Sequence, residues 1–227
     1  MTELAERLSA IDDAIADAAR HAGRDAAEIT RIVVTKFHPA SLVAELHALG
    51  VLDVGENRQQ ELAEKTAQLG PLDSLRWHFI GQAQTNKAAA IRRTAQVVHS
   101  VDRERLADAL ERAAEDDDPL DVLVQVNLTE DAARGGVPPQ DLERLAEHVL
   151  ALPTLRLRGI MAVAPVDEEP APAFARLHGL AERLRAVAPE ASWVSAGMTG
   201  DFREAIAAGA THLRIGSAIT GPRPVRG

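Results

Sequence analysis

The sequence predicts an α/β protein in which parallel strands close into a single (β/α)8 TIM barrel, preceded by one extra helix. Short apolar runs recur along the chain with helical patterns between them, and this alternation is typical of parallel α/β folds. The runs lie at residues 31–35, 51–54, 77–80, 97–101, 122–128, 155–162, 193–196 and 211–215. About eight strands with intervening helices favour a closed barrel. An open doubly wound sheet stays the alternative, because no sequence pattern reports closure directly.

The helices between these runs have legible ends. Four glycines each follow an Ala- and Leu-rich helical pattern and are expected just past a helix end: Gly23, Gly50, Gly70 and Gly209. The extra helix precedes the first strand, and four apolar residues form one stripe along it: Leu4, Leu8, Ile11 and Ile15.

Composition predicts one domain over residues 1–227. A hydrophobic content of 46% allows a large core, and the absence of cysteine excludes disulfides and thiolate metal sites. That absence fits a reducing compartment, so we expect a soluble cytoplasmic protein. Early acidic residues such as Glu3 and Glu6, with no long apolar run, argue against a signal peptide or a membrane span. The net charge of -9 argues against nucleic-acid or anionic-membrane binding but allows a small anionic ligand. The histidines lack metal-ligand spacing, so no metal site is expected.

Lysine is rare in this chain, with three lysines among 25 basic residues. Lys36 ends the first apolar run and should point into the mouth of the barrel, where desolvation would favour the neutral amine that can attack an aldehyde. A strand-end lysine with its ammonium group in water is an equally good interpretation of the position alone. Lys65 is expected at the surface, paired with Glu61 one helical turn earlier.

The last two strand ends suggest an anion site. Ser195, Gly197 and Thr199 after the seventh run, with Gly216 and Ser217 after the eighth, supply hydroxyl groups and bare backbone N–H groups. Barrel phosphate sites often occur at this position. A helix cap by Thr199 with tight turns would explain the same residues.

Several ordered motifs resemble a known family. They are residues 34–36 (VTK), 55–57 (GEN), 77–81 (WHFIG), 158–162 (RGIMA), 197–198 (GM) and 214–219 (RIGSAI). Together they are similar to the pyridoxal 5′-phosphate (PLP) homeostasis proteins, whose barrel resembles the N-terminal domain of bacterial alanine racemase. The sequence departs from the family pattern at several positions. Phe37 and His38 replace a Thr-Lys pair, Arg58 stands where an aromatic residue is usual, and Arg134 stands where lysine is usual. Thr199 and Ser217 replace the usual Ser and Thr, and Gly200 replaces an acidic residue.

The resemblance implies a site for covalently bound PLP. Lys36 would carry the cofactor as a Schiff base, and Asn57 and Met198 would contact it. Four residues would hold the phosphate: Ser195, Thr199, Gly216 and Ser217. Arg214 would face the pyridine nitrogen, and because a guanidinium group keeps its proton, that nitrogen should stay unprotonated.

The resemblance also implies a role in vitamin B6 (PLP) homeostasis. The protein would be a monomeric, non-catalytic carrier that buffers PLP and could deliver it to apo-enzymes. A PLP-dependent amino-acid racemase is the alternative, but alanine-racemase chemistry uses a tyrosine base from a second domain, and this chain has no tyrosine. A barrel enzyme that acts on a phosphorylated metabolite without PLP is a third hypothesis.

Overall fold

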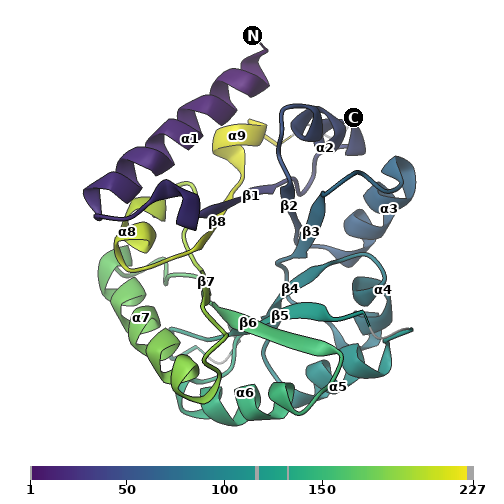
Figure 1. Ribbon diagram of the computed structural model, residues 1–227, viewed down its shortest axis with the longest axis vertical. Coiled ribbons are helices and arrows are strands. Elements are labelled where there is room, and N and C mark those ends of the chain that lie inside the picture. Colours follow the sequence, from purple (N-terminus) through teal and green to yellow (C-terminus); the bar gives the residue numbers. More distant parts are fainter. Residues whose placement is uncertain (1, 116–117, 132, 224–227) are drawn as a thin grey trace.

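The strands close into a barrel whose order follows the chain, from β1 through β8 and back to β1 (Figure 1). The computed structural model describes residues 2–115, 118–131 and 133–223. All neighbouring strands are parallel. They are β1 (Thr30–Val34), β2 (Asp53–Glu56), β3 (Arg76–Phe79), β4 (Val97–Val101), β5 (Leu120–Gln125), β6 (Leu155–Met161), β7 (Trp193–Ser195) and β8 (His212–Ile215). The predicted closed barrel is confirmed, and the open sheet is excluded.

The helices form a ring around the barrel (Figure 1). They are α1 (Glu3–His21), α2 (Ala40–Ala48), α3 (Gln59–Leu69), α4 (Ala88–Arg92), α5 (Glu104–Arg112), α6 (Leu142–Leu150), α7 (Pro170–Val187), α8 (Phe202–Ala207) and α9 (Ser217–Thr220). Short 3-10 turns are η1 (Ala26–Glu28), η2 (Thr85–Lys87) and η3 (Pro139–Asp141). The glycines predicted at helix ends all have positive φ, as a residue past a helix end requires.

Two strands, β2 and β5, differ from their predicted ranges by two or more residues at an end. β2 continues through Gly55 and Glu56, which pair with His78 and Phe79 of β3. Neither residue has a large apolar side chain, so the apolar run that predicts this strand ends at Val54. β5 ends at Gln125 instead of residue 128, because the chain then turns to form a bridge with Val137. The acidic run at residues 116–118, followed by Pro119, is typical of a helix end and loop, and residues 116–117 lie outside the described residues.

The extra helix α1 packs beside α8 and α9 (Figure 1). Leu4, Leu8 and Ile15 are buried on the predicted stripe, and Ile11 is partly buried. The side chain of Arg7 also donates to the Ile219 carbonyl oxygen at 2.7 Å. This helix therefore covers the outside of the barrel next to the last strand.

Most of the hydrophobic core lies between the strands and the helical ring. Inside the barrel, the separate apolar cluster is small and consists of Val97, Leu123 and Met161, with Trp193 against it. Buried polar residues lie on several of the same strands, and His78 and His99 are fully buried. The barrel interior of this protein is therefore unusually polar for a packed barrel core.

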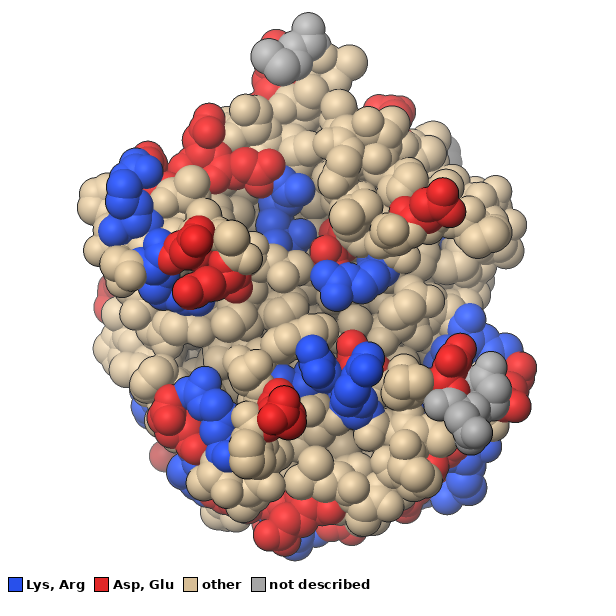
Figure 2. Space-filling model, viewed as in Figure 1, with Lys and Arg blue, Asp and Glu red and all other residues tan. Residues whose placement is uncertain are grey.

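The surface carries mixed charges. On the face shown in Figure 2, basic and acidic side chains are interspersed without one large region of a single sign. Among the described helices, none combines the length and apolar character needed to cross a membrane.

Candidate functional site

The predicted site residues lie at the carboxyl ends of four strands that are consecutive around the barrel, β7, β8, β1 and β2. They are Ser195, Met198 and Thr199 at β7, Arg214, Gly216 and Ser217 at β8, Lys36 after β1 and Asn57 after β2. Because these strands neighbour one another, the residues share one sector of the rim where barrel proteins carry their functional groups.

Lys36 lies at this rim with an exposed side chain. Its Nζ lies 5.8 Å from the centre of the Phe37 ring. The expected desolvation of the Lys36 amine is therefore not seen in this structure. Phe37 has φ of 70°, a left-handed conformation that is rare for residues other than glycine. Its backbone N–H donates to Glu61 Oε2 at 2.8 Å, which holds the turn that follows Lys36.

Lys65 is buried, so its predicted surface position is wrong. Its Nζ donates to the Thr35 carbonyl oxygen at 2.8 Å and forms an ion pair with Glu56, whose side chain is fully buried. Thr35 Oγ1 donates to the same carboxylate at 2.6 Å. Glu61, the predicted partner, accepts from Phe37 instead. Spacing along a helix finds neighbours on one face but not whether that face meets the barrel.

The Glu56 carboxyl group lies in an environment that disfavours charge. Burial raises the pKa of Glu56 above its ordinary value, although the Lys65 ammonium group opposes the shift. The buried pair lies directly behind the turn that carries Lys36. It therefore fixes the ends of β1 and β2 against α3.

The remaining rim residues offer several free polar groups. Asn57 is half-buried, and among the described residues no hydrogen-bond partner reaches its Oδ1. Thr199 and Ser217 are exposed, so their hydroxyl groups reach the rim. Met198 is 39% exposed, and its backbone N–H donates to Asp201 Oδ1 at 2.6 Å. A buried oxygen without a partner, at the end of the strand next to that of Lys36, fits a ligand that supplies a hydrogen-bond donor.

Arg214 is the buried cation of this sector. Its Nη1 donates to Ser195 Oγ at 2.7 Å, and its Nη2 donates to the Ala162 carbonyl oxygen at 2.9 Å. Burial lowers the pKa of Arg214 to about 10. The guanidinium group therefore stays charged near neutral pH. The hydroxyl group of Ser195 is fully buried and also contacts His99 Nδ1 at 2.9 Å.

The sequence interpretation missed two residues behind Arg214. His78, which lies between Trp77 and Phe79 in the third apolar run, is a hydrogen-bonded core residue, because its ring contacts Asp53 Oδ1 at 2.8 Å and His99 Nε2 at 2.9 Å. Asp53 and His99 were not assigned to the site. Their signal was a polar residue within an apolar strand, but only the register shows that they face one another.

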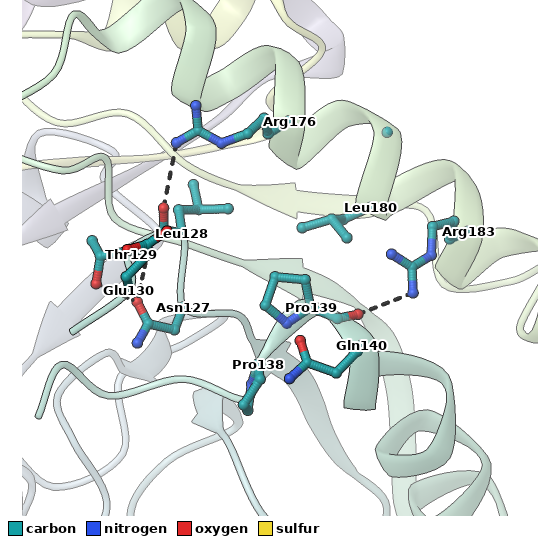
Figure 3. A pocket seen from close by; sticks show the side chains of 11 residues that line it. Asn127, Leu128, Thr129, Glu130, Pro138, Pro139, Gln140, Arg176, Leu180 and Arg183 are labelled. Atoms are coloured by element: carbon teal, nitrogen blue, oxygen red, sulfur yellow. Dashed lines mark hydrogen bonds between the residues drawn. The ribbon is translucent and has the colours of Figure 1, made fainter. Parts of the chain in front are cut away.

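A large groove lies away from this sector (Figure 3). Its volume is about 760 Å³, and it is lined by the loop after β5, η3 and α7. Arg176 donates to the Leu128 carbonyl oxygen at 3.3 Å, and Arg183 donates to the Pro139 carbonyl oxygen at 3.0 Å. None of the predicted site residues lines this groove, so it is separate from the candidate site.

Comparison with known proteins defines the class of this barrel. The family model of the alanine racemase N-terminal domain matches residues 7–224. PipY of Synechococcus elongatus, solved with PLP bound, has a TM-score of 0.85 and 33% identity, with 96% of this chain and 100% of that chain covered. The family match and the closed parallel barrel thus define an alanine racemase N-terminal-type barrel.

Curated relatives give the particular family. The pyridoxal phosphate homeostasis protein of Pseudomonas aeruginosa is 42% identical over 98% of this chain and 97% of its own length. That of Mycobacterium tuberculosis is 39% identical over 99% of this chain and 95% of its own length. The chain belongs to the family of pyridoxal phosphate homeostasis proteins.

Proposed function

We propose that this protein binds PLP reversibly as a Schiff base on Lys36 and so serves vitamin B6 homeostasis in the cytoplasm. The observation that carries the proposal is the placement of Lys36 and the buried cation Arg214 at the ends of neighbouring strands. A similar barrel, PipY, has been solved with PLP bound.

Different rim residues would contact different parts of PLP. PLP supplies an aldehyde, and its condensation with the Lys36 amine releases one water molecule. Thr199, Gly216 and Ser217 would hold the phosphate in the loops after β7 and β8, beside Ser195. Asn57 and Met198 would contact the ring, and the unpartnered Asn57 Oδ1 supports this role.

Arg214 favours a carrier over an enzyme. Its guanidinium group stays charged, so it can only donate hydrogen bonds to the pyridine nitrogen and leaves that nitrogen without a proton. An unprotonated ring withdraws electrons poorly from a bound amino acid. The chain also supplies no tyrosine for the opposing base of a racemase. We therefore infer that the protein stores PLP without catalysis.

The proposal includes how the store is used. Residues 1–227 would act as a single PLP-binding barrel domain and as a monomer. The exposed Lys36 side chain leaves the covalent bond open to attack by water or by an amine. That accessibility would allow PLP to pass to apo-enzymes.

Absorbance spectroscopy tests the binding step. The protein is incubated with PLP and dialysed, beside the variants Lys36→Ala and Lys87→Ala. The absorbance band of the Schiff base should be lost in Lys36→Ala and retained in Lys87→Ala, because Lys87 is an exposed lysine at η2 outside the site. A band that survives in Lys36→Ala would contradict the proposal.

A second assay separates carrier from enzyme. The loaded protein is incubated with L-alanine, and D-alanine is measured over time with alanine racemase as the positive control. We expect no racemisation above that of free PLP. Turnover that requires Lys36 would support the racemase alternative.

A further inference from the structure

A continuous chain of hydrogen-bonded side chains crosses the inside of the barrel. His78 Nε2 lies 2.8 Å from Asp53 Oδ1, and His78 Nδ1 lies 2.9 Å from His99 Nε2. His99 Nδ1 lies 2.9 Å from Ser195 Oγ, which accepts from Arg214 Nη1 at 2.7 Å. All of these residues are buried, and each comes from a different strand. These hydrogen-bonded side chains thus connect the amino end of β2 to Arg214 at the rim without a gap.

The aspartate at one end determines which atom donates and which accepts in each of these hydrogen bonds. Burial alone would raise the pKa of Asp53, but hydrogen bonds from His78 and Arg76 lower it below its ordinary value. Asp53 is therefore ionised near neutral pH and can only accept. Arg76 Nη2 lies 2.8 Å from the same oxygen and supplies the charge partner. His78 must then carry its hydrogen on Nε2.

The two histidines pass this constraint along the chain. Burial lowers the pKa of His78, and it lowers the pKa of His99 well below its ordinary value, so both rings are neutral. With its hydrogen on Nε2, His78 presents a bare Nδ1, and His99 must donate to it from Nε2. His99 Nδ1 is then bare as well. It can be satisfied only by the hydroxyl hydrogen of Ser195.

We propose that Asp53, His78, His99 and Ser195 are positioning residues that hold the guanidinium group of Arg214 in one orientation at the rim. The hydroxyl hydrogen of Ser195 is used by His99, so its oxygen is left as an acceptor for Arg214. The Ala162 carbonyl oxygen fixes the second terminal nitrogen of Arg214. The significance of the chain for PLP rests on the proposed function, in which Arg214 faces the pyridine nitrogen.

This arrangement also refines the phosphate site. A phosphate group needs donors, and the Ser195 hydroxyl group has no hydrogen left to donate. The hydroxyl groups that remain for the phosphate are those of Thr199 and Ser217. Ser195 therefore belongs to the site through Arg214.

Nitrogen NMR of the protein without added PLP tests the chain directly. In ¹⁵N-labelled protein near neutral pH, His78 and His99 should both be neutral with the hydrogen on Nε2. A charged ring, or a hydrogen on Nδ1 of either residue, would overturn the proposal. This measurement needs no variant and does not depend on cofactor binding.

Two variants test transmission along the chain. Ser195→Ala removes the oxygen that accepts from Arg214 Nη1, and Asp53→Leu removes the oxygen that accepts from His78 Nε2. In both, the Arg214 side-chain N–H groups should exchange with water about tenfold faster, as the loss of one charged hydrogen bond implies. In Asp53→Leu, His99 should also show both tautomers. If Asp53→Leu does not fold, Ser195→Ala and the wild-type tautomers decide.

The matched control is His212→Gln. His212 is a buried barrel histidine on β8, but it bonds Thr211 Oγ1 and lies against Trp193, outside the chain. This variant should leave the His99 tautomer and Arg214 exchange unchanged. Equal effects of His212→Gln and Ser195→Ala on Arg214 would show only general loosening and would overturn the proposal.

A final arm adds PLP to the same proteins. The absorbance maximum of the bound cofactor should shift in Ser195→Ala and not in His212→Gln, because the contact between Arg214 and the pyridine nitrogen changes only in the first. If the wild-type protein forms no PLP band while the tautomers are as predicted, the proposed function is contradicted, but the proposed chain of hydrogen-bonded side chains is supported. If the band forms in the wild type and does not shift in Ser195→Ala, the proposed effect on PLP is wrong.

Discussion

Glu56 and Lys65 form an ion pair buried between the end of β2 and α3. Both charges have left water, and each depends on the other and on Thr35 for compensation. An intact buried ion pair contributes little net stability. Removal of one partner, however, leaves the other charge buried and uncompensated, which is strongly destabilising. At the scale of single residues, substitution of either partner of this pair behind Lys36 should therefore lower the stability of the protein.

Substitution of Lys65 should reveal this dependence. Lys65→Met leaves the Glu56 carboxylate without its cation, and the free energy of unfolding should fall by about 3–5 kcal/mol. Urea denaturation followed by circular dichroism measures the loss. The control is Lys87→Met, an exposed lysine for which the change should stay within about 0.5 kcal/mol. Equal stability of the two variants would contradict a buried pair.

At the scale of elements, β6 carries the tightest backbone approach. The register between β5 and β6 shifts after Val122, and Gly159 follows the irregularity. A Cβ atom on Gly159 would lie 1.8 Å from the Trp193 carbonyl oxygen of β7. Gly179 in α7 is the opposite case, since a Cβ atom there meets nothing within 4 Å. The two glycines allow a matched comparison.

Gly159→Ala should open the β6–β7 pairing and cost several kcal/mol, or prevent folding, because the obstacle is backbone and cannot rotate away. Gly179→Ala should stabilise the protein by about 0.5–1 kcal/mol, because alanine is favoured over glycine inside a helix. Thermal denaturation of both variants checks the pair. A Gly159→Ala protein as stable as the wild type would show that the two strands are not in this register.

The elements were largely predictable because apolar runs mark buried parallel strands and glycines mark helix ends. The end of β2 was not, because Gly55 and Glu56 are paired strand residues without apolar side chains. The burial of Lys65 was not predictable, because periodicity shows which residues share a helix face but not which element packs against that face. These errors share one cause, since both depend on contacts between elements that are distant in sequence.

At the scale of the whole molecule, the barrel interior holds three buried histidines, His78, His99 and His212. Burial lowers the pKa of each, and that of His212 falls to about 3. The chain of contacts through His99 could not be predicted from sequence, because it depends on the mutual register of several strands. The rim residues could be proposed, because each strand end is marked by a motif.

Acid should therefore unfold this protein. Below the ordinary histidine pKa of 6.5, the unfolded chain binds protons that the folded barrel excludes, so stability falls as the pH falls. A histidine whose pKa in the folded protein lies well below this range, as for His99 and His212, contributes up to about 1.4 kcal/mol per pH unit. Glu56 acts in the opposite direction, because its raised pKa lets the folded protein bind a proton first. The net slope at about pH 5 should therefore lie between about one and about three protons.

Urea denaturation at several pH values between about pH 7 and about pH 5 measures this slope. His99→Gln should reduce it by about one proton, whereas His21→Gln, at an exposed position on α1, should leave it unchanged. Stability that is flat across this range would mean that the three histidines titrate normally in the folded protein.

The attachment of PLP to Lys36 is tested most directly by chemistry. The protein is loaded with PLP, reduced with borohydride and digested, and the modified lysine is located by peptide mass mapping. We predict a pyridoxyl label on Lys36 and on neither of the other two lysines. A label on Lys65 or Lys87 with an unmodified Lys36, or no label on any lysine, would contradict the account.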